Sequence, residues 1–145
     1  MYKTLKPALI AAAALIGVAV PAGAQEISAI KDGIHVIQGK GGNIGVSAGA
    51  DGVFMIDDQF APLTEKIVAA IRSLNDGQIR FLINTHVHGD HTGGNENLGK
   101  MGVQILARDE VRVRLSQQAP QAALPVLTYS EAITIHLNGE EVYAF

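Results

Sequence analysis

Short apolar runs separated by turn residues fill the first third of the chain beyond residue 24. Runs of strand length, rich in β-branched residues, predict four strands, at residues 27–30, 34–38, 44–48 and 53–56. Lys31-Asp32-Gly33 and the segment 49–52 contain the residues that favour turns. We therefore expect two antiparallel hairpins in this part of the chain.

The period of the apolar residues changes from strand-like to helical after Pro62. Leucine, isoleucine and alanine recur at i, i+4, i+7, i+8 and i+11, at Leu63, Ile67, Ala70, Ile71 and Leu74. This spacing predicts one amphipathic helix that packs on a sheet through its apolar face. It is expected to end at Asn75-Asp76-Gly77.

Residues 81–83 are all apolar, with no polar residue between them. Such a run is typical of a strand covered on both faces, so we expect a central strand here. Farther on, the pattern predicts a short helix at 94–98, a strand at 103–107 and a helix capped by Asp109.

The last part of the chain predicts a loop followed by a hairpin. Residues 119–125 are punctuated by prolines, and apolar residues alternate with polar ones over 133–137. Asn138-Gly139 is a strong signal for a type I′ turn, so residues 140–145 should form the returning strand. Since the chain ends on apolar residues in the middle of this expected strand, we expect a truncated reading frame.

Histidine and aspartate gather directly after the expected central strand. Three of the five histidines and one aspartate lie within six positions in the pattern H-x-H-x-D-H, at His86, His88, Asp90 and His91. A solvated loop is the alternative interpretation, but four ligand-type residues at this spacing favour a metal site. Imidazole with carboxylate suits zinc or a similar first-row metal better than calcium or magnesium.

The spacing suggests how two ions are bound. If the backbone is extended from Thr85 to His88, residues two apart point the same way, so His86 and His88 could bind one cation. Gly89 allows a sharp turn that would place Asp90 and His91 in the first turn of a helix, facing a second cation.

At these residues the chain resembles the metallo-β-lactamase superfamily, whose hallmark is H-x-H-x-D-H after a central strand. The resemblance extends over about residues 33–145 and includes Gly42-Asn43-Ile44-Gly45 and the segment 51–57. It implies an α/β (α+β) fold, the first half of a four-layer αβ/βα sandwich. The family's remaining ligands, two histidines and a bridging acidic residue, have no counterpart in this sequence.

The resemblance also implies roles for individual residues. His86 and His88 would bind a first Zn²⁺ and Asp90 and His91 a second, with Asp90 also orienting the nucleophile and accepting its proton. Asp57 would orient, by hydrogen bonds, the segment that carries these four residues, here called the metal loop. An ordinary role as an aspartate in a turn is an equal alternative for Asp57. His35 and His136 are not expected to be ligands.

These roles predict a zinc-dependent hydrolase. A metal-activated hydroxide would attack a small-molecule substrate, a β-lactam, lactone, thioester or related ester. The alternative is a catalytically silent fragment that binds metal weakly or needs a partner chain. An electron-carrier accessory is a third possibility, but no cysteine, haem motif or flavin signature supports it.

The N-terminus predicts export to the periplasm or outside the cell. Lys3 and Lys6 precede an apolar run at 8–20, and Ala22-Gly23-Ala24 is an A-x-A cleavage site, so residues 1–24 read as a signal peptide. The run is shorter than the about 20 residues of a membrane span, although a retained anchor is the alternative.

The remaining residues, 25–145, have the length of one domain. Without Lys3 and Lys6 they carry nine basic and 14 acidic side chains, a net charge of −5, which argues against nucleic acid and anionic membranes as partners. No cysteine is present, so no disulfide stabilises the exported chain.

Overall fold

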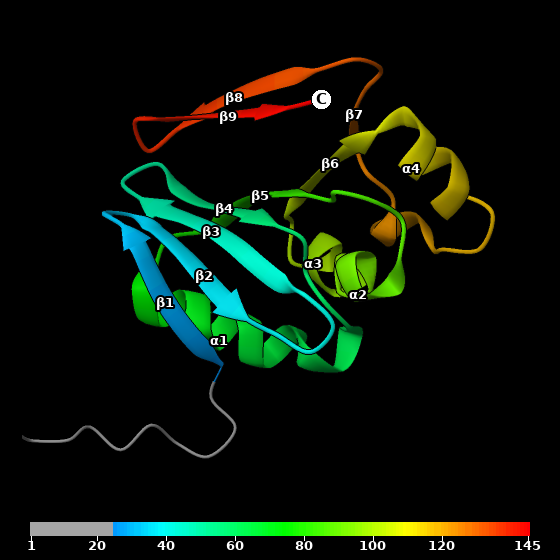
Figure 1. The fold of residues 1–145 in the computed structure, drawn as a ribbon. Coiled ribbons are helices and arrows are strands. Elements are labelled where there is room, and N and C mark those ends of the chain that lie inside the picture. The colour runs from blue at the N-terminus through cyan, green and yellow to red at the C-terminus, as the bar shows by residue number, and fades with distance from the viewer. Residues whose placement is uncertain (1–24) are drawn as a thin grey trace, which may run out of the picture.

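The computed structural model describes residues 25–145, and the expected signal peptide at 1–24 lies outside this range (Figure 1). Seven strands form one sheet in the order β1-β2-β3-β4-β5-β6-β7, and β8 and β9 form a separate two-stranded sheet. The strands are β1 (Glu26–Lys31), β2 (Ile34–Gln38), β3 (Asn43–Gly49), β4 (Gly52–Ile56), β5 (Ile79–Ile83), β6 (Gln104–Arg108), β7 (Leu127–Tyr129), β8 (Ile133–Leu137) and β9 (Glu140–Ala144). The helices are α1 (Thr64–Leu74), α2 (Gly89–Thr92), α3 (Asn95–Lys100) and α4 (Asp109–Leu115), with 3-10 turns η1 (Ala61–Leu63) and η2 (Gln121–Ala123).

The large sheet is antiparallel in its first half and parallel in its second. Strands β1–β2 and β3–β4 form the two expected antiparallel hairpins, and β2 also pairs antiparallel with β3. Strands β4 to β7 pair in parallel, and each crossover contains helical segments. The carboxyl ends of the parallel strands meet at one edge of the sheet, and β5 delivers the H-x-H-x-D-H segment there.

Helix α1 covers one face of the large sheet through the predicted apolar stripe (Figure 1). Ile67 and Ile71 are buried in the stripe, and they pack with Ile37, Met55 and Leu82 from the sheet. Leu63, Ala70 and Leu74 complete the stripe as partly buried residues. The helical period of the sequence therefore identified the face of α1 that forms the core.

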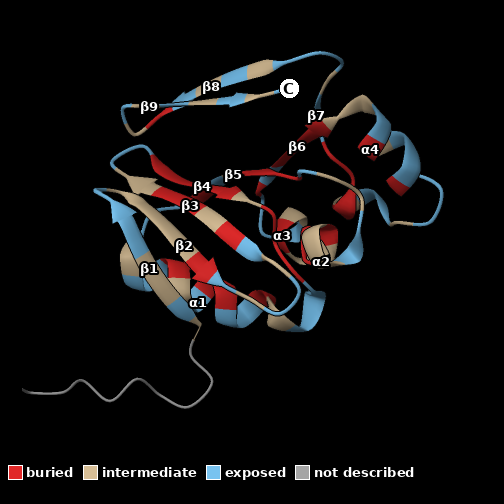
Figure 2. Cartoon of the chain, in the orientation of Figure 1, coloured by how far each residue is buried: buried red, intermediate tan, exposed pale blue. Residues whose placement is uncertain are grey.

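The hairpin β8–β9 lies against the opposite face of the sheet (Figure 2). Phe54, Ile83 and Leu106 from the sheet are buried there with Leu137 of β8. Leu82 and its neighbour Ile83 thus belong to cores on opposite faces, which confirms that the central strand is covered on both sides.

The turn of this hairpin has the predicted backbone. Asn138 and Gly139 have φ of 56° and 75°, as a type I′ turn requires.

Two local expectations are wrong, and one strand was not predicted. The backbone bends through residues 85–88 instead of staying extended, because β5 ends at Ile83. Asp109 does not cap α4: Arg108 is the cap residue, without a side-chain cap bond, since β6 runs directly into the helix. Strand β7 was not predicted, because three residues are too few to show a period, and only pairing with β6 defines them.

None of the helices within residues 25–145 is long and apolar enough to cross a membrane.

Candidate metal centre

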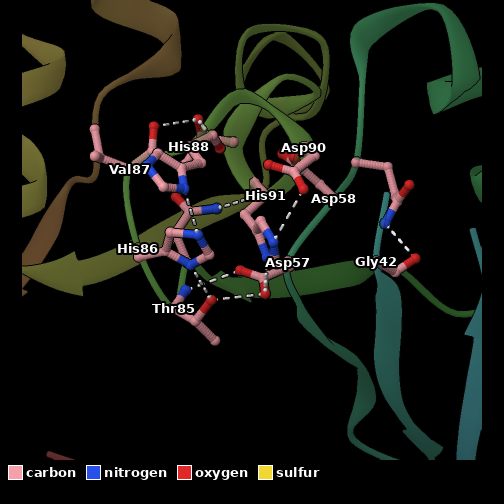
Figure 3. A network of polar contacts seen from close by, with 12 residues as sticks. Gly42, Asp57, Asp58, Thr85, His86, Val87, His88, Asp90 and His91 are labelled. Carbon is pink, nitrogen blue, oxygen red and sulfur yellow. Dashed lines mark hydrogen bonds and ion pairs between the residues drawn. The ribbon is translucent and has the colours of Figure 1, made fainter. Parts of the chain in front are cut away.

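The four predicted ligands lie together where the chain leaves β5 (Figure 3). His86 and His88 lie on the bend, and Asp90 and His91 lie on α2, whose first turn closes with His91 N–H donating to the His88 carbonyl at 2.9 Å. The ring centroids of His86 and His88 are 4.8 Å apart and those of His86 and His91 are 4.0 Å apart. The bend, rather than strand alternation, brings the rings together.

The donor atoms form two close pairs. His86 Nε2 is 3.2 Å from His88 Nδ1, and His91 Nε2 is 3.4 Å from Asp90 Oδ2. Two ligand atoms that each lie 2.0–2.1 Å from one tetrahedral zinc ion are about 3.3 Å apart. Each pair therefore has the spacing of two ligands on a shared ion, and the donor types suit zinc.

Each pair has only two members. Within the described part of the chain, no group of three or more His, Cys, Asp or Glu side chains is placed to hold a metal ion. A catalytic zinc usually has three protein ligands, so residues 25–145 provide two incomplete sets that fit zinc in chemistry and spacing.

Asp57, at the end of β4, lies beneath the metal loop, as the resemblance implied. Its Oδ1 accepts a hydrogen bond from the Thr85 N–H at 2.8 Å. Its Oδ2 accepts one from the Thr85 hydroxyl at 2.8 Å and lies 2.7 Å from His91 Nδ1. The side chain is almost fully buried, so these contacts replace the water that a carboxylate otherwise requires.

The same hydrogen bonds decide which ring nitrogens are free to bind a metal. His91 donates from Nδ1–H to Asp57, which leaves the lone pair on Nε2, beside Asp90. Since the Thr85 hydroxyl donates to Asp57, its oxygen accepts from Nδ1–H of His86 at 3.0 Å, which leaves the Nε2 lone pair of His86 facing His88. One buried carboxylate thus orients two imidazoles.

Asp58, which sequence reasoning did not single out, connects β4 to the far end of the metal loop. Its Oδ1 accepts a hydrogen bond from the Gly94 N–H at 3.0 Å, whereas its Oδ2 is buried without a partner. Burial raises the pKa of Asp58 to about 8, and the nearby Asp57 carboxylate adds to this against the Gly94 hydrogen bond. The side chain is therefore mostly neutral at pH 7. Its only sequence signal was the pair of aspartates that ends a strand.

The glycine-rich loop before β3, residues 39–42, lies against Asp90 and His91. A Cβ atom on Gly41 would be 3.1 Å from Asp90 Cβ, and one on Gly42 would be 3.4 Å from His91 Cε1. Gln59 is buried with φ of 62°, and its side-chain amide donates to the Gly42 carbonyl at 2.5 Å. The loop is thus tied beside Asp90 and His91.

The other two histidines take no part in the cluster. The side chain of His136 is 72% exposed and lies 3.8 Å from Glu141, as expected for a residue on the outer face of the hairpin. His35 lies in β2, where it pairs with Ala29 and Val46, and its Nδ1 has no hydrogen-bond partner.

Comparison with known proteins supports the family resemblance. Residues 36–102 match the model of the metallo-β-lactamase superfamily. A hydroxyacylglutathione hydrolase of Nitrosococcus oceani is 41% identical over 56 residues, which are 35% of this chain and 21% of that protein.

Solved structures share the fold. A metallo-β-lactamase from Pontibacter korlensis superimposes with a TM-score of 0.71 at 17% identity, over 83% of this chain and 60% of that one. The structure of TMB-1 does so with a TM-score of 0.67 at 23% identity, over 83% of this chain and 59% of that one. The chain thus spans about a fifth of the curated relative and about three fifths of these structures. Over residues 36–102 the chain matches the metallo-β-lactamase superfamily in sequence, and it has the fold of the first half of that family's domain.

Proposed function

We propose that this chain provides the first ligands of a dinuclear zinc hydrolase. The observation that supports this most is the spacing of the two donor pairs, 3.2 Å for His86 and His88 and 3.4 Å for Asp90 and His91, at the sheet edge. Bound zinc supplies Lewis-acid chemistry, because it polarises a carbonyl group and lowers the pKa of water from 15.7 to about 7.

The residues of the chain have distinct tasks in this proposal. Asp57 and Thr85 hold the imidazoles of His86 and His91 with the Nε2 lone pairs turned to the reaction site. Asp90, half-buried on α2, orients the nucleophilic water and accepts its proton. The glycine-rich loop packs closely against this side of the site, because a Cβ atom on Gly41 would lie only 3.1 Å from Asp90 Cβ.

The substrate class that we propose is a small molecule with an activated acyl group, such as a β-lactam, lactone, thioester or related ester. The relatives carry the names of hydrolases, and this supports the reaction type. A cavity of about 250 Å³ opens beside Thr85, between Ile83, Tyr129 and the end of β9, and its walls are largely apolar. It is suited to the apolar part of such a substrate.

A second candidate function follows from the incomplete ligand sets. Since no third ligand joins either pair within residues 25–145, the chain would bind metal weakly, or catalyse only with ligands from a partner chain. We place either activity in the periplasm or outside the cell, because of the basic, apolar and A-x-A order of residues 1–24. N-terminal sequencing of exported material tests this, since it should begin at Gln25.

Metal analysis of the purified chain beside a hydrolysis panel separates the two functions. The panel contains a chromogenic β-lactam, a lactone and a hydroxyacyl thioester. Bound zinc with turnover supports the hydrolase, whereas zinc-free or inactive protein supports the silent chain.

In a longer version of the protein with complete ligand sets, His88→Ala is the matching variant, because a methyl group cannot replace a ligand, and it should abolish most of the bound zinc and the turnover. His136→Ala is the control, since its imidazole is solvated, and it should change neither quantity. Equal losses in the two variants would show that the site lies elsewhere.

A further inference from the structure

Two buried asparagines mark the two ends of the metal loop. Asn84 directly follows β5, and Asn95 begins α3, so the four candidate ligands lie on the segment between them. The two residues are 1% and 0% exposed. We propose that Asn84 and Asn95 are positioning residues, whose paired side-chain amides close the base of the loop and fix the backbone that carries the ligands.

The two amides bind each other reciprocally. Asn84 Nδ2 donates to Asn95 Oδ1 at 3.0 Å, and Asn95 Nδ2 donates to Asn84 Oδ1 at 2.9 Å. Each amide can donate two hydrogen bonds, and this pair uses all four N–H groups. Eleven residues of chain separate the partners, so the amide pair closes the loop as a cross-link would.

The remaining donor of each amide reaches a different part of the site. Asn84 Nδ2 donates to the backbone carbonyl of His91 at 3.0 Å, within the metal loop itself. Asn95 Nδ2 donates to the carbonyl of Ala123 in η2 at 2.9 Å. The pair thus connects the start of the loop, a ligand residue on it and the segment that packs outside α3.

Asn84 is itself fixed, because its backbone N–H donates to the Leu106 carbonyl of β6 at 2.9 Å. Asn84 therefore connects β6 to the backbone of His91 through two hydrogen bonds. Asp57 acts on the imidazole ring of the same residue. Two independent contacts thus define His91, one on its backbone and one on its side chain.

The chemistry of the pair makes its two members interdependent. A buried amide that loses its partner is left with unsatisfied polar atoms, which costs free energy. Replacing either asparagine with aspartate keeps the size of the side chain but removes both N–H donors. In Asn95→Asp, acceptor would face acceptor at Asn84 Oδ1 and at the Ala123 carbonyl.

The test compares Asn95→Asp with Asn138→Asp in the full chain. Asn138 also donates two side-chain hydrogen bonds across the fold, to Ser47 and Gly52, but it lies in the β8–β9 turn, away from the metal loop (Figure 1).

Cobalt(II) binding is followed by its visible absorption, and this readout rests on the proposed metal sites. Asn95→Asp should weaken cobalt binding by about 10- to 100-fold and alter the spectrum, as expected for the loss of a residue that orients ligands. Asn138→Asp should change the melting temperature but leave cobalt affinity within about twofold, which is small against the change expected for Asn95→Asp. Equal effects on cobalt binding would overturn the proposal.

Hydrogen exchange of the metal-free chain gives a second readout that needs no metal. The side-chain amide protons of Asn84 and Asn95 should exchange slowly in the unaltered protein, and the backbone N–H groups of Thr85 and Gly94 should exchange faster in Asn95→Asp. Rapid exchange of both side-chain amides in the unaltered protein would contradict the proposal, even if the variant fails to fold. If the unaltered chain binds no cobalt, the proposed function fails, while slow amide exchange still supports the positioning role.

Discussion

Asp57 and Asp58 are neighbours with opposite tasks in the metal loop. Asp57 uses both oxygens, on Thr85 and His91, and has φ of 61°, an unusual backbone conformation that aspartate tolerates better than most residues. Asp58 uses one oxygen, on the Gly94 N–H, and is buried in its neutral form. The end of β4 thus holds both ends of the loop, with a charge beneath the histidines and a neutral group beneath the glycines.

The raised pKa of Asp58 predicts a specific dependence of stability on pH. The folded-state pKa of about 8 lies above the ordinary value of 3.8, so the folded protein binds the proton more tightly than the unfolded one. Its contribution to stability is fully present below about pH 4 and is lost as the pH rises through 8. Asp58→Asn keeps an acceptor for Gly94 and cannot ionise, so it should be more stable than the unaltered chain at pH 8.5.

Thermal unfolding of both proteins at pH 5 and pH 8.5 measures this effect. The difference in melting temperature between Asp58→Asn and the unaltered chain should grow with pH, by roughly 4–8 °C for each kcal/mol. Other titrating groups affect both proteins alike and cancel in the difference. A difference that stays constant with pH would mean that Asp58 is not protonated in the folded state.

At the scale of elements, two turns distant in sequence hold the hairpin on the sheet. Asn138 in the β8–β9 turn accepts a hydrogen bond from the Asp51 N–H at 2.9 Å, and its own N–H donates to Asp51 Oδ2 at 2.8 Å. Its side-chain amide donates to Ser47 Oγ and to the Gly52 carbonyl. This contact positions β8–β9 over the apolar face that contains Phe54 and Ile83.

We expect Asn138→Ala to loosen the hairpin. It removes the side-chain hydrogen bonds and places alanine at φ of 56°, where asparagine is favoured. The free energy of unfolding should fall by about 1–3 kcal/mol, as measured by urea denaturation. Ser116→Ala is the control, because it removes only a local hydrogen bond to the Val113 carbonyl on an exposed turn, and it should cost less than about 0.5 kcal/mol.

At the scale of the whole molecule, the two-stranded sheet leaves apolar side chains in solvent. Tyr143 and Phe145 are 60% and 80% exposed, and their ring centroids are 5.7 Å apart. Val126 and Leu127, where β7 begins, are also exposed. Contiguous exposed apolar surface favours association, and open strand edges favour pairing between chains.

The whole chain is therefore expected to self-associate. It is also expected to bind zinc far more weakly than a protein with complete ligand sets, because metal affinity and folding are coupled. Size-exclusion chromatography with light scattering measures the first effect, and competition with a chromophoric chelator measures the second. The double variant Tyr143→Ser, Phe145→Ser should shift the chain towards monomer. A monodisperse monomer that holds two zinc ions with nanomolar affinity would contradict this expectation.

Local sequence determined the elements whose signals repeat over a few residues. The period of α1, the alternation of β8, the Asn138-Gly139 turn and the cluster of four ligand-type residues were each readable, because near neighbours in sequence define them. Family resemblance added the order of the elements and the part of Asp57.

Tertiary structure alone decided the contacts between distant segments. Asp58 meets Gly94 across 36 residues, Asn95 meets Ala123 across 28, and β7 exists as a strand only through its pairing with β6. No local period encodes such contacts, since each depends on where the sheet places two chain segments. The bend at residues 85–88 also depends on distant segments. After β5, the Asn84 N–H donates to the Leu106 carbonyl of β6 and the Thr85 N–H donates to Asp57 Oδ1. The bend that follows brings the three imidazoles together.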